Sequence, residues 1–309
     1  MTFRLAHISD IHLGPLPKAG FRDLLSKRVT GYVNWHRNRG KKRDPEILSA
    51  LLERLQIDRS DHLAITGDLI NIGLDEEIEN AGLWLEALGK PKNVTVVPGN
   101  HDAYVRDTLA KALARWQGYI TGDDGADITS NDDFPTLRIR DNVAIIGVNS
   151  AIVTAPFVAA GRVETEQCER LTEILMQAAK DALFRVVLIH HPPIRGATRP
   201  QKRLYGIGNF QRTILEVGAE LILHGHTHLP QRHVISDRFG RQIPVLGVPS
   251  ASEGLDGRKP ASGYNLFEIE RDENADAWRL AMRYEGYTGP ASGFTMREQR
   301  VYDIPFTGS

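Results

Sequence analysis

The chain has 309 residues, 41% of them hydrophobic and 25% charged, which is enough to bury the core of one large domain or two smaller ones. Its 38 Lys+Arg residues nearly balance its 39 Asp+Glu residues, and the formal net charge of -1 excludes a global attraction to nucleic acid or to an anionic membrane. Any attraction to phosphate groups must therefore be local. The single cysteine, Cys168, excludes an intrachain disulfide and a thiolate metal cluster, and we interpret it as a packing residue.

The N-terminal residues do not resemble a signal peptide. His7 and Asp10 interrupt the apolar stretch that a signal peptide requires, and no part of the chain reaches the roughly 18 consecutive apolar residues of a membrane span. We therefore expect a cytoplasmic protein without a membrane span, and a homo-oligomer is compatible with the sequence.

A first buried strand is predicted over residues 3–9, and the segment 13–44 that follows has no clear period. This segment is the most basic part of the chain, with Lys18, Arg22, Lys27, Arg28, Arg37, Arg39, Lys41, Lys42 and Arg43. Two interpretations are open. The segment is either a flap that steers an anionic substrate, or a solvated amphipathic helix with Val29, Val33 and Trp35 packed underneath.

Helical and apolar patterns alternate after this segment, starting with a helix that Asp44 caps and Pro45 opens. The predicted elements are helix 45–56, strand 62–66, helix 75–88, strand 93–97, helix 105–116, strands 136–140 and 143–149, helix 164–180, strand 185–189, helix 209–217 and strand 219–223. The alternation predicts a layered α/β fold. Four further runs, at 231–236, 242–248, 263–270 and 277–284, suggest a second sheet pairing against the first. Residues 286–309 are predicted to form an irregular tail.

Five of the apolar runs end in side chains that can bind a metal ion. These side chains are Asp10 and His12, Asp68, Asn100 with His101, His190, and His226 with His228. In a layered α/β fold, ligands collect outside the carboxyl ends of the strands, so these residues can converge on one crevice. Carboxylate, imidazole and amide groups without thiolate suit Mn²⁺, Fe or Zn²⁺. Seven of these eight side chains, as ligands, fit two ions about 3.5–4 Å apart that are bridged by one carboxylate.

The series Asp-x-His, Gly-Asp, Gly-Asn-His-Asp, His and Gly-His-x-His, over residues 7 to 228, resembles the calcineurin-like metallophosphoesterase superfamily. The resemblance implies a four-layer α-β-β-α sandwich of two mixed sheets flanked by helices, which we place at residues 1–285. It implies two metal ions, one held by Asp10, His12 and His228 and the other by Asn100, His190 and His226, with Asp68 bridging. It further implies that His101 is the acid beside the substrate phosphate, oriented by Asp102.

Two other histidines lie inside the same motifs. His190 is taken as the ligand because it lies two residues before Pro192, as the family pattern requires. His191 is then expected behind the ligands, and His224 is expected to be a hydrogen-bonded core residue.

The motifs look most similar to the bacterial cyclic-nucleotide and glycerophosphodiester phosphodiesterase branch. That resemblance implies hydrolysis of small phosphodiesters, in which a metal-bridging hydroxide attacks in line and His101 assists the leaving group. Asn71 replaces the tyrosine of purple acid phosphatases, and Asp102 argues against protein serine/threonine phosphatases. A phosphomonoesterase or a pyrophosphatase of a nucleotide-linked lipid precursor is the alternative. A non-catalytic scaffold is less favoured because every ligand position is filled, and a nuclease because the net charge is near zero.

Substrate choice is expected to lie in loops that differ within the family. One is the basic segment 13–44, and another follows Pro193. Residues of this second loop could bind a non-scissile phosphate or a base; they are Arg195, Arg199, Lys202, Arg203 and Tyr205, with Arg195 and Tyr205 as the candidate substrate-binding residues. The alternative for this second loop is a solvated surface without a role in binding.

Overall fold

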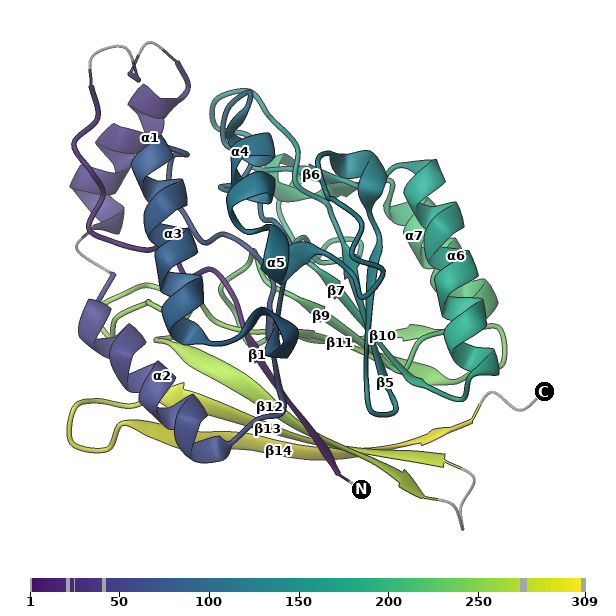
Figure 1. The fold of residues 1–309 in the computed structure, drawn as a ribbon. Helices are drawn as coiled ribbons and strands as arrows, with labels where there is room; N and C mark the ends of the chain where they lie inside the picture. The colour runs from purple at the N-terminus through teal and green to yellow at the C-terminus, as the bar shows by residue number, and fades with distance from the viewer. Residues whose placement is uncertain (1, 21–22, 25, 41–42, 273–276, 307–309) are drawn as a thin grey trace.

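The computed structural model describes residues 2–20, 23–24, 26–40, 43–272 and 277–306. Two six-stranded mixed sheets stack on each other, and helices cover their outer faces (Figure 1). The predicted four-layer α-β-β-α sandwich is therefore confirmed. No helix in the described ranges has the length and hydropathy needed to cross a bilayer.

The first sheet has the N-terminal strand near its middle. In spatial order its strands are β14 (Phe294–Pro305), β13 (Ala277–Tyr287), β12 (Gly263–Asp272), β1 (Phe3–Ile8), β2 (His62–Ile65) and β3 (Val94–Val96). Strands β1, β2 and β3 are parallel to one another, whereas β12 pairs with β1 in antiparallel orientation. The strand β2 shows the two-residue alternation of a sheet buried on both faces, since Leu63 and Ile65 face the helices while Ala64 faces the other sheet.

The second sheet is parallel in its centre. Its strands are β10 (Arg232–Ser236), β11 (Gln242–Gly247), β9 (Leu221–His224), β7 (Phe184–Ile189), β5 (Val143–Val148) and β4 (Thr136–Arg140). The outermost strands β10 and β4 are antiparallel to their neighbours. A separate two-stranded sheet joins β6 (Gly161–Arg162) to β8 (Leu204–Tyr205).

Helices pack on both outer faces through three apolar layers. The helices are α1 (Arg28–Asn34), α2 (Pro45–Asp58), α3 (Asp75–Leu88), α4 (Thr108–Arg115), α5 (Gln117–Ile120), α6 (Thr165–Lys180) and α7 (Ile207–Val217), with a π-helical turn η1 (Trp35–Arg39) and 3₁₀ turns η2 (Pro91–Asn93), η3 (Asn131–Asp133) and η4 (Pro200–Lys202). Helices α2 to α5 cover the first sheet, α6 and α7 cover the second, and a middle layer lies between the sheets. Asp44 caps α2 as predicted, because its carboxylate accepts the N–H of Glu46 at 2.9 Å.

The prediction of an irregular tail at 286–309 was wrong. Strand β14 occupies Phe294–Pro305 and pairs with β13 along its length. Because β14 is an edge strand and most of its side chains are at least partly exposed, it lacks the apolar pattern that marks a buried strand.

The four apolar runs that precede β14 also do not form one new sheet. Strands β10 and β11 extend the second sheet, while β12 and β13 join the first because β12 pairs with β1.

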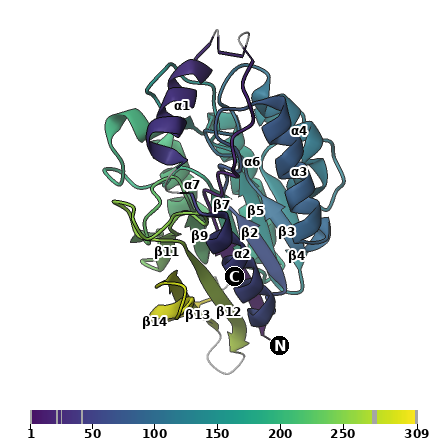
Figure 2. The ribbon, with the colours of Figure 1, turned by 90° about the vertical axis from the view of Figure 1, so that its left-hand side faces the viewer.

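The predicted packing of Val29 and Val33 beneath a helix was also wrong. Helix α1 has no buried residue, and these two valines are 43% and 41% exposed. The inward face of α1 is instead the one with Gly31, where a Cβ atom would lie 2.6 Å from the Ile72 side chain. Figure 2 shows α1 at the opposite end of the molecule from the N-terminus. The helix predicted at 105–116 is confirmed in a shorter form as α4, and the separate helix α5 begins just after the predicted range.

Candidate metal centre

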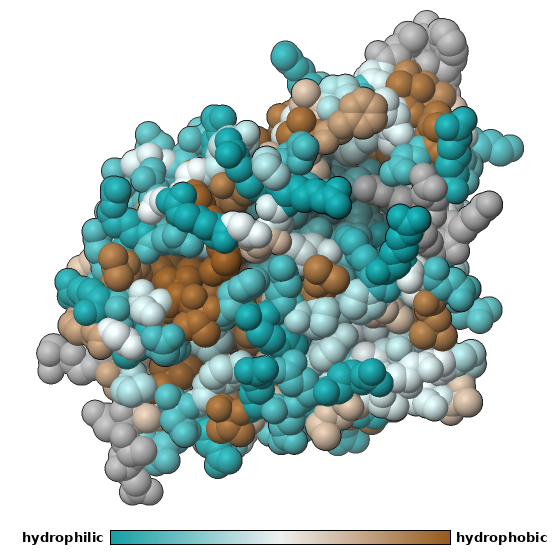
Figure 3. Space-filling model, turned by 180° about the vertical axis from the view of Figure 1, so that it is seen from behind, coloured by the Kyte–Doolittle hydropathy of each residue, from teal (hydrophilic) through white to brown (hydrophobic). Residues whose placement is uncertain are grey.

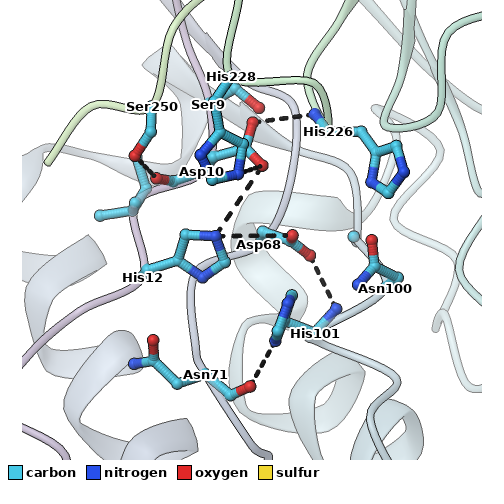
Figure 4. A network of polar contacts seen from close by, with 12 residues as sticks. Ser9, Asp10, His12, Asp68, Asn71, Asn100, His101, His226, His228 and Ser250 are labelled. Carbon is cyan, nitrogen blue, oxygen red and sulfur yellow. Dashed lines mark hydrogen bonds and ion pairs between the residues drawn. The ribbon is translucent and has the colours of Figure 1, made fainter. Parts of the chain in front are cut away.

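The loops after five parallel strands meet at one edge of the sandwich. They follow β1, β2 and β3 of the first sheet and β7 and β9 of the second. Hydrogen bonds join the two sheets there, since His190 Nδ1 lies 2.6 Å from the Thr66 carbonyl oxygen. The His226 N–H also donates to Asp10 Oδ2 at 2.9 Å, as Figure 4 shows. The strand ends therefore bring the candidate ligands of both sheets together.

Five of the seven predicted ligands have a left-handed backbone conformation. Their φ angles are 53° at Asp10, 46° at His12, 58° at Asp68, 67° at His226 and 54° at His228. This conformation costs a residue with a side chain about 1–2 kcal/mol, so tertiary contacts must hold it. The N–H groups of Asp10 and His12 donate to the carbonyl oxygens of Gly67 and Asp68, each at 2.9 Å. Such strain is typical of functional sites, where the backbone aims side chains at a common point.

Asp10, His12 and His228 form the first predicted ligand set, and the structure brings them together. Their ligand atoms lie within 4.8 Å of one another. Asp10 Oδ1 is buried and has no well-oriented hydrogen bond among the described residues; His228 Nε2 lies 3.0 Å from it and His12 Nε2 lies 4.0 Å from it. A buried carboxylate oxygen that faces two imidazole nitrogens fits a cation that binds all three.

Asp68 lies between the two predicted sets. Its Oδ2 atom is 3.8 Å from His12 Nε2 and 3.5 Å from His190 Nε2. The amide oxygen of Asn100 is 3.3 Å from the same His190 nitrogen. Asp68 therefore occupies the position that a bridging carboxylate requires, and Asn100 and His190 adjoin it on one side.

The ring of His226 lies beside His190 and His191, and the ligand atoms of these three histidines are within 4.8 Å of one another. His226 Nε2 is 3.1 Å from the Lys202 carbonyl oxygen, which can only accept, so Nδ1 is the nitrogen with a lone pair. His191 differs because both of its nitrogens have partners. Nε2 donates to the Ala159 carbonyl at 3.3 Å, and Nδ1 contacts Ser150 Oγ at 2.8 Å. These contacts leave His191 no lone pair for a metal ion.

The candidate ligands differ in their charge states. The Nδ1–H groups of His12 and His190 donate to the carbonyl oxygens of Ile70 and Thr66, so each Nε2 faces the site. Burial lowers the pKa of His190, but the charge of Asp68 raises it more, to about 9, so a metal ion at His190 has to displace a proton. Burial and the charge of Arg43 lower the pKa of His12 well below its usual range, which favours the neutral ring. Burial raises the pKa of Asp68, but His190 and His101 lower it more, so this carboxylate stays ionised.

Residues 3–230 match the family described as calcineurin-like phosphoesterase. This chain belongs to that family. The match spans most of the chain and confirms the superfamily that the motifs indicated.

Solved structures share the fold of this phosphoesterase. A dimetal phosphatase from Danio rerio is 13% identical with a TM-score of 0.61, and 99% of both chains is covered. A purple acid phosphatase from yellow lupin (Lupinus luteus) seeds is 12% identical with a TM-score of 0.62, and 99% of this chain and 54% of that chain are covered. A 5'-nucleotidase precursor from Thermus thermophilus is 14% identical with a TM-score of 0.50, covering 99% of this chain and 55% of that one. No curated protein sequence matches significantly.

In this phosphoesterase, the expected contact between Asp102 and the ring of His101 is replaced by another. The carboxylate of Asp102 accepts four backbone N–H groups, from Gly99, Asp68, Leu69 and Ile70, at 2.8 to 3.3 Å. The turn after Gly99 directs Asp102 back toward its own loop, because the Asp102 N–H donates to the Gly99 carbonyl. His101 Nδ1 instead donates to the Asn71 carbonyl, and its ring stacks on Tyr104. Asp102 therefore fixes the two loops, and Asn71 orients His101.

A group behind His228 was missed in the sequence. Arg43 and Glu253 form a buried ion pair of 3.1 Å, and Glu253 Oε2 lies 3.9 Å from His228 Nδ1. Ser250 Oγ donates to the Asp10 carbonyl at 2.6 Å. The signal was present, since Ser250 to Glu253 follow the apolar run 242–248 in the way that the other polar motifs follow their strands.

The phosphoesterase has a cavity of about 360 Å³ over these residues. Its walls contain the candidate ligands Asp68, Asn100, His226 and His228, together with His101. Four other segments form the rim, with Lys27, Thr30, Gly31 and Asn34, then Tyr104, then Phe157 to Ala159, and then Lys202. The basic segment therefore does line the site. The candidate substrate residues Arg195 and Tyr205 do not, because they line a different cavity beside the start of α7. His224 is buried, with Nδ1 3.1 Å from the Gly225 carbonyl oxygen.

Proposed function

We propose that this phosphoesterase hydrolyses small phosphodiesters, of the cyclic-nucleotide or glycerophosphodiester type, with two metal ions. The observation that carries the proposal is the position of Asp68, whose Oδ2 lies between His12 and His190 at 3.8 and 3.5 Å. One ion would be held on the side of Asp10, His12 and His228. The other would be held by Asn100, His190 and His226.

Two ions of the Mn, Fe or Zn class supply positive charge for the phosphate oxygens and lower the pKa of water when they are bound. The protein residues would supply the bridging carboxylate and the acid for the leaving group. Asp68 contributes the shared carboxylate, and its Oδ1 accepts the N–H of His101 at 2.8 Å, which links the ligand to the acid. Because Nδ1 of His101 is engaged with the Asn71 carbonyl, Nε2 is the atom that holds the proton for the leaving oxygen.

The cavity walls support a diester as the substrate. Away from the ligands, the rim has uncharged side chains, including Tyr104, Phe157 and Val158, which give room for a second esterified group. Two cations, Lys27 and Lys202, also line this cavity, and the Nζ of Lys27 donates to Thr154 Oγ1 at 2.8 Å. The support for a diester therefore comes from the uncharged part of the rim.

The test is hydrolysis of bis(p-nitrophenyl) phosphate against p-nitrophenyl phosphate with added Mn²⁺, together with metal analysis. We expect a larger kcat/KM for the diester, with about two ions bound per chain. A preference for the monoester contradicts the diester assignment. Hydrolysis without metal stimulation, or less than about one ion per chain, contradicts the dinuclear centre.

One observation favours a second candidate, a pyrophosphatase of a nucleotide-linked lipid precursor. An apolar cavity of about 350 Å³ adjoins the ligand His12, and its lining includes Leu13, Pro15, Trp35 and Leu48. Its position suits an acyl chain on a substrate whose phosphate is at the ligands. Comparing cleavage of CDP-diacylglycerol and CDP-glycerol tests this candidate, because an acyl-binding cavity predicts a lower KM for the acylated compound.

A further inference from the structure

Charge is distributed very unevenly along this chain. The segment 13–44 contains nine of the 38 basic residues and two of the 39 acidic ones, so its formal charge is +7 against -8 for the rest of the chain. Such an asymmetry indicates an anionic partner for the segment, although the net charge of the whole chain is near zero.

The same segment exposes apolar side chains. Val29 and Val33 are one helical turn apart on α1, so they share a face, and both are more than 40% exposed. Lys18, His36 and Arg37 are also exposed. Seen from behind, hydrophobic atoms gather at the end of the molecule that carries α1 (Figure 3, upper right). An apolar stripe beside basic residues is typical of helices that lie in the surface of an anionic membrane.

Contacts on the other face of α1 fix its orientation. Arg28 Nε donates to the Ile72 carbonyl at 3.2 Å, and Lys27 Nζ donates to Thr154 Oγ1 at 2.8 Å. With Gly31 pressed against Ile72, the helix cannot rotate to bury the two valines without losing these contacts. The valines are therefore held outward by polar bonds on the opposite side.

The exposed stripe is continuous with the mouth of the metal cavity. Lys27, Thr30 and Asn34 of the same helical segment line that cavity. A flat partner lying on α1 would consequently face the cavity opening.

We propose that α1 and η1, with the exposed basic residues Lys18 and Arg37, dock on the surface of an anionic lipid bilayer and place the metal cavity at headgroup level. Basic residues near such a surface each strengthen binding by about 1 kcal/mol, or about fivefold. The valines favour lipid over nucleic acid, because duplex backbones are bound mainly through charged and polar groups.

The test is co-sedimentation of the full chain with phosphatidylcholine vesicles and with vesicles in which a quarter of the lipid is phosphatidylglycerol. We expect binding to the anionic vesicles only, and weaker binding as salt is raised. Val33→Asp and Val29→Asp should each weaken binding by about tenfold, and Arg37→Glu by about fivefold or more. Leu215→Asp is the matched control, since Leu215 is 46% exposed on α7, and it should bind like the wild type.

Vesicle binding is measured without substrate, so its outcome does not depend on the proposed catalytic activity. A midpoint of urea unfolding equal to that of the wild type shows that Val33→Asp is folded. Equal binding to both vesicle types overturns the proposal, as does unchanged binding by the two aspartate variants. Binding of a duplex oligonucleotide that Arg37→Glu weakens and Val33→Asp does not would also overturn it in favour of nucleic acid.

Discussion

Gly225 lies between His224 and His226 and packs against Ser9 and Asp10, which follow the first strand. Replacing Gly225 tests how the candidate metal centre is held together. A Cβ atom at this position would overlap Ser9 Oγ and would lie 2.9 Å from Ser9 Cβ and 2.7 Å from Asp10 Oδ2. Ser9 Oγ can rotate away only by losing its hydrogen bond to the Thr66 carbonyl, which is 3.0 Å long. The Ser9 Cβ atom cannot move unless the backbone of the first strand moves.

The expected cost of Gly225→Ala follows from these contacts. Forcing an extra methyl group into a packed site costs about 1–3 kcal/mol, and the lost Ser9 hydrogen bond adds about 1 kcal/mol. We therefore expect the free energy of unfolding, measured by urea denaturation of the metal-free protein, to fall by about 2–4 kcal/mol. Displacement of Asp10 should also weaken Mn²⁺ binding, measured by isothermal titration calorimetry.

Two further variants test whether the loss of stability comes from the close contact between residue 225 and Ser9. Gly89→Ala is the control, because a Cβ there meets only the Val94 side chain at 3.6 Å, an ordinary contact, and its effect on stability should be small. In the double variant Ser9→Ala/Gly225→Ala the overlap with Oγ is gone, so the loss should be smaller than the sum of the single losses. If Gly225→Ala unfolds like the wild type and binds Mn²⁺ with unchanged affinity, the close packing at the two strand ends is refuted.

Three further predictions concern catalysis, metal and pH. His101→Ala should keep its metal content but lose about 10²–10⁴ in kcat on a diester with a poor leaving group; near-native turnover would exclude His101 as the acid. Removing metal with a chelator should abolish hydrolysis and lower the midpoint of thermal unfolding, because ions at a hundred times their Kd stabilise by about 2.7 kcal/mol. Burial and the charges of Arg138 and Arg140 lower the pKa of His62 to about 3. Protonation therefore favours the unfolded chain, and stability should fall as the pH drops from about 6.5 toward 3 by up to about 1.4 kcal/mol per unit. His62→Gln should flatten this dependence in urea titrations, and an unchanged slope would contradict it.

The fold and the gathering of candidate ligands could be predicted because both rest on local patterns. Apolar runs that end in Asp, Asn or His mark strand ends, and parallel strands bring such ends to one edge. Asp68, His190 and Asn100 lie on three different loops, yet each can be recognised in the sequence because it directly follows an apolar run.

The contacts of individual side chains could not be predicted in this way. Asp102 follows His101 directly, but the turn at Gly99 sends the two side chains to different partners. Strand β14 has no apolar pattern because its pairing with β13 depends on backbone groups that every residue carries. The valines of α1 are apolar at helical spacing and still exposed, since polar bonds from Lys27 and Arg28 decide which face turns inward.

The order of strands in the first sheet has a consequence for how the enzyme is made. Strand β1 lies between β2 and β12, so Leu5 pairs with His62 on one side and with Phe267 on the other. During synthesis β1 therefore has an open edge until almost the whole chain has left the ribosome. Asp10 likewise receives the N–H of His226 from 216 residues away. A chain that ends before His228 therefore lacks part of the candidate ligand set, and one that ends before Gly263 leaves one edge of β1 unpaired.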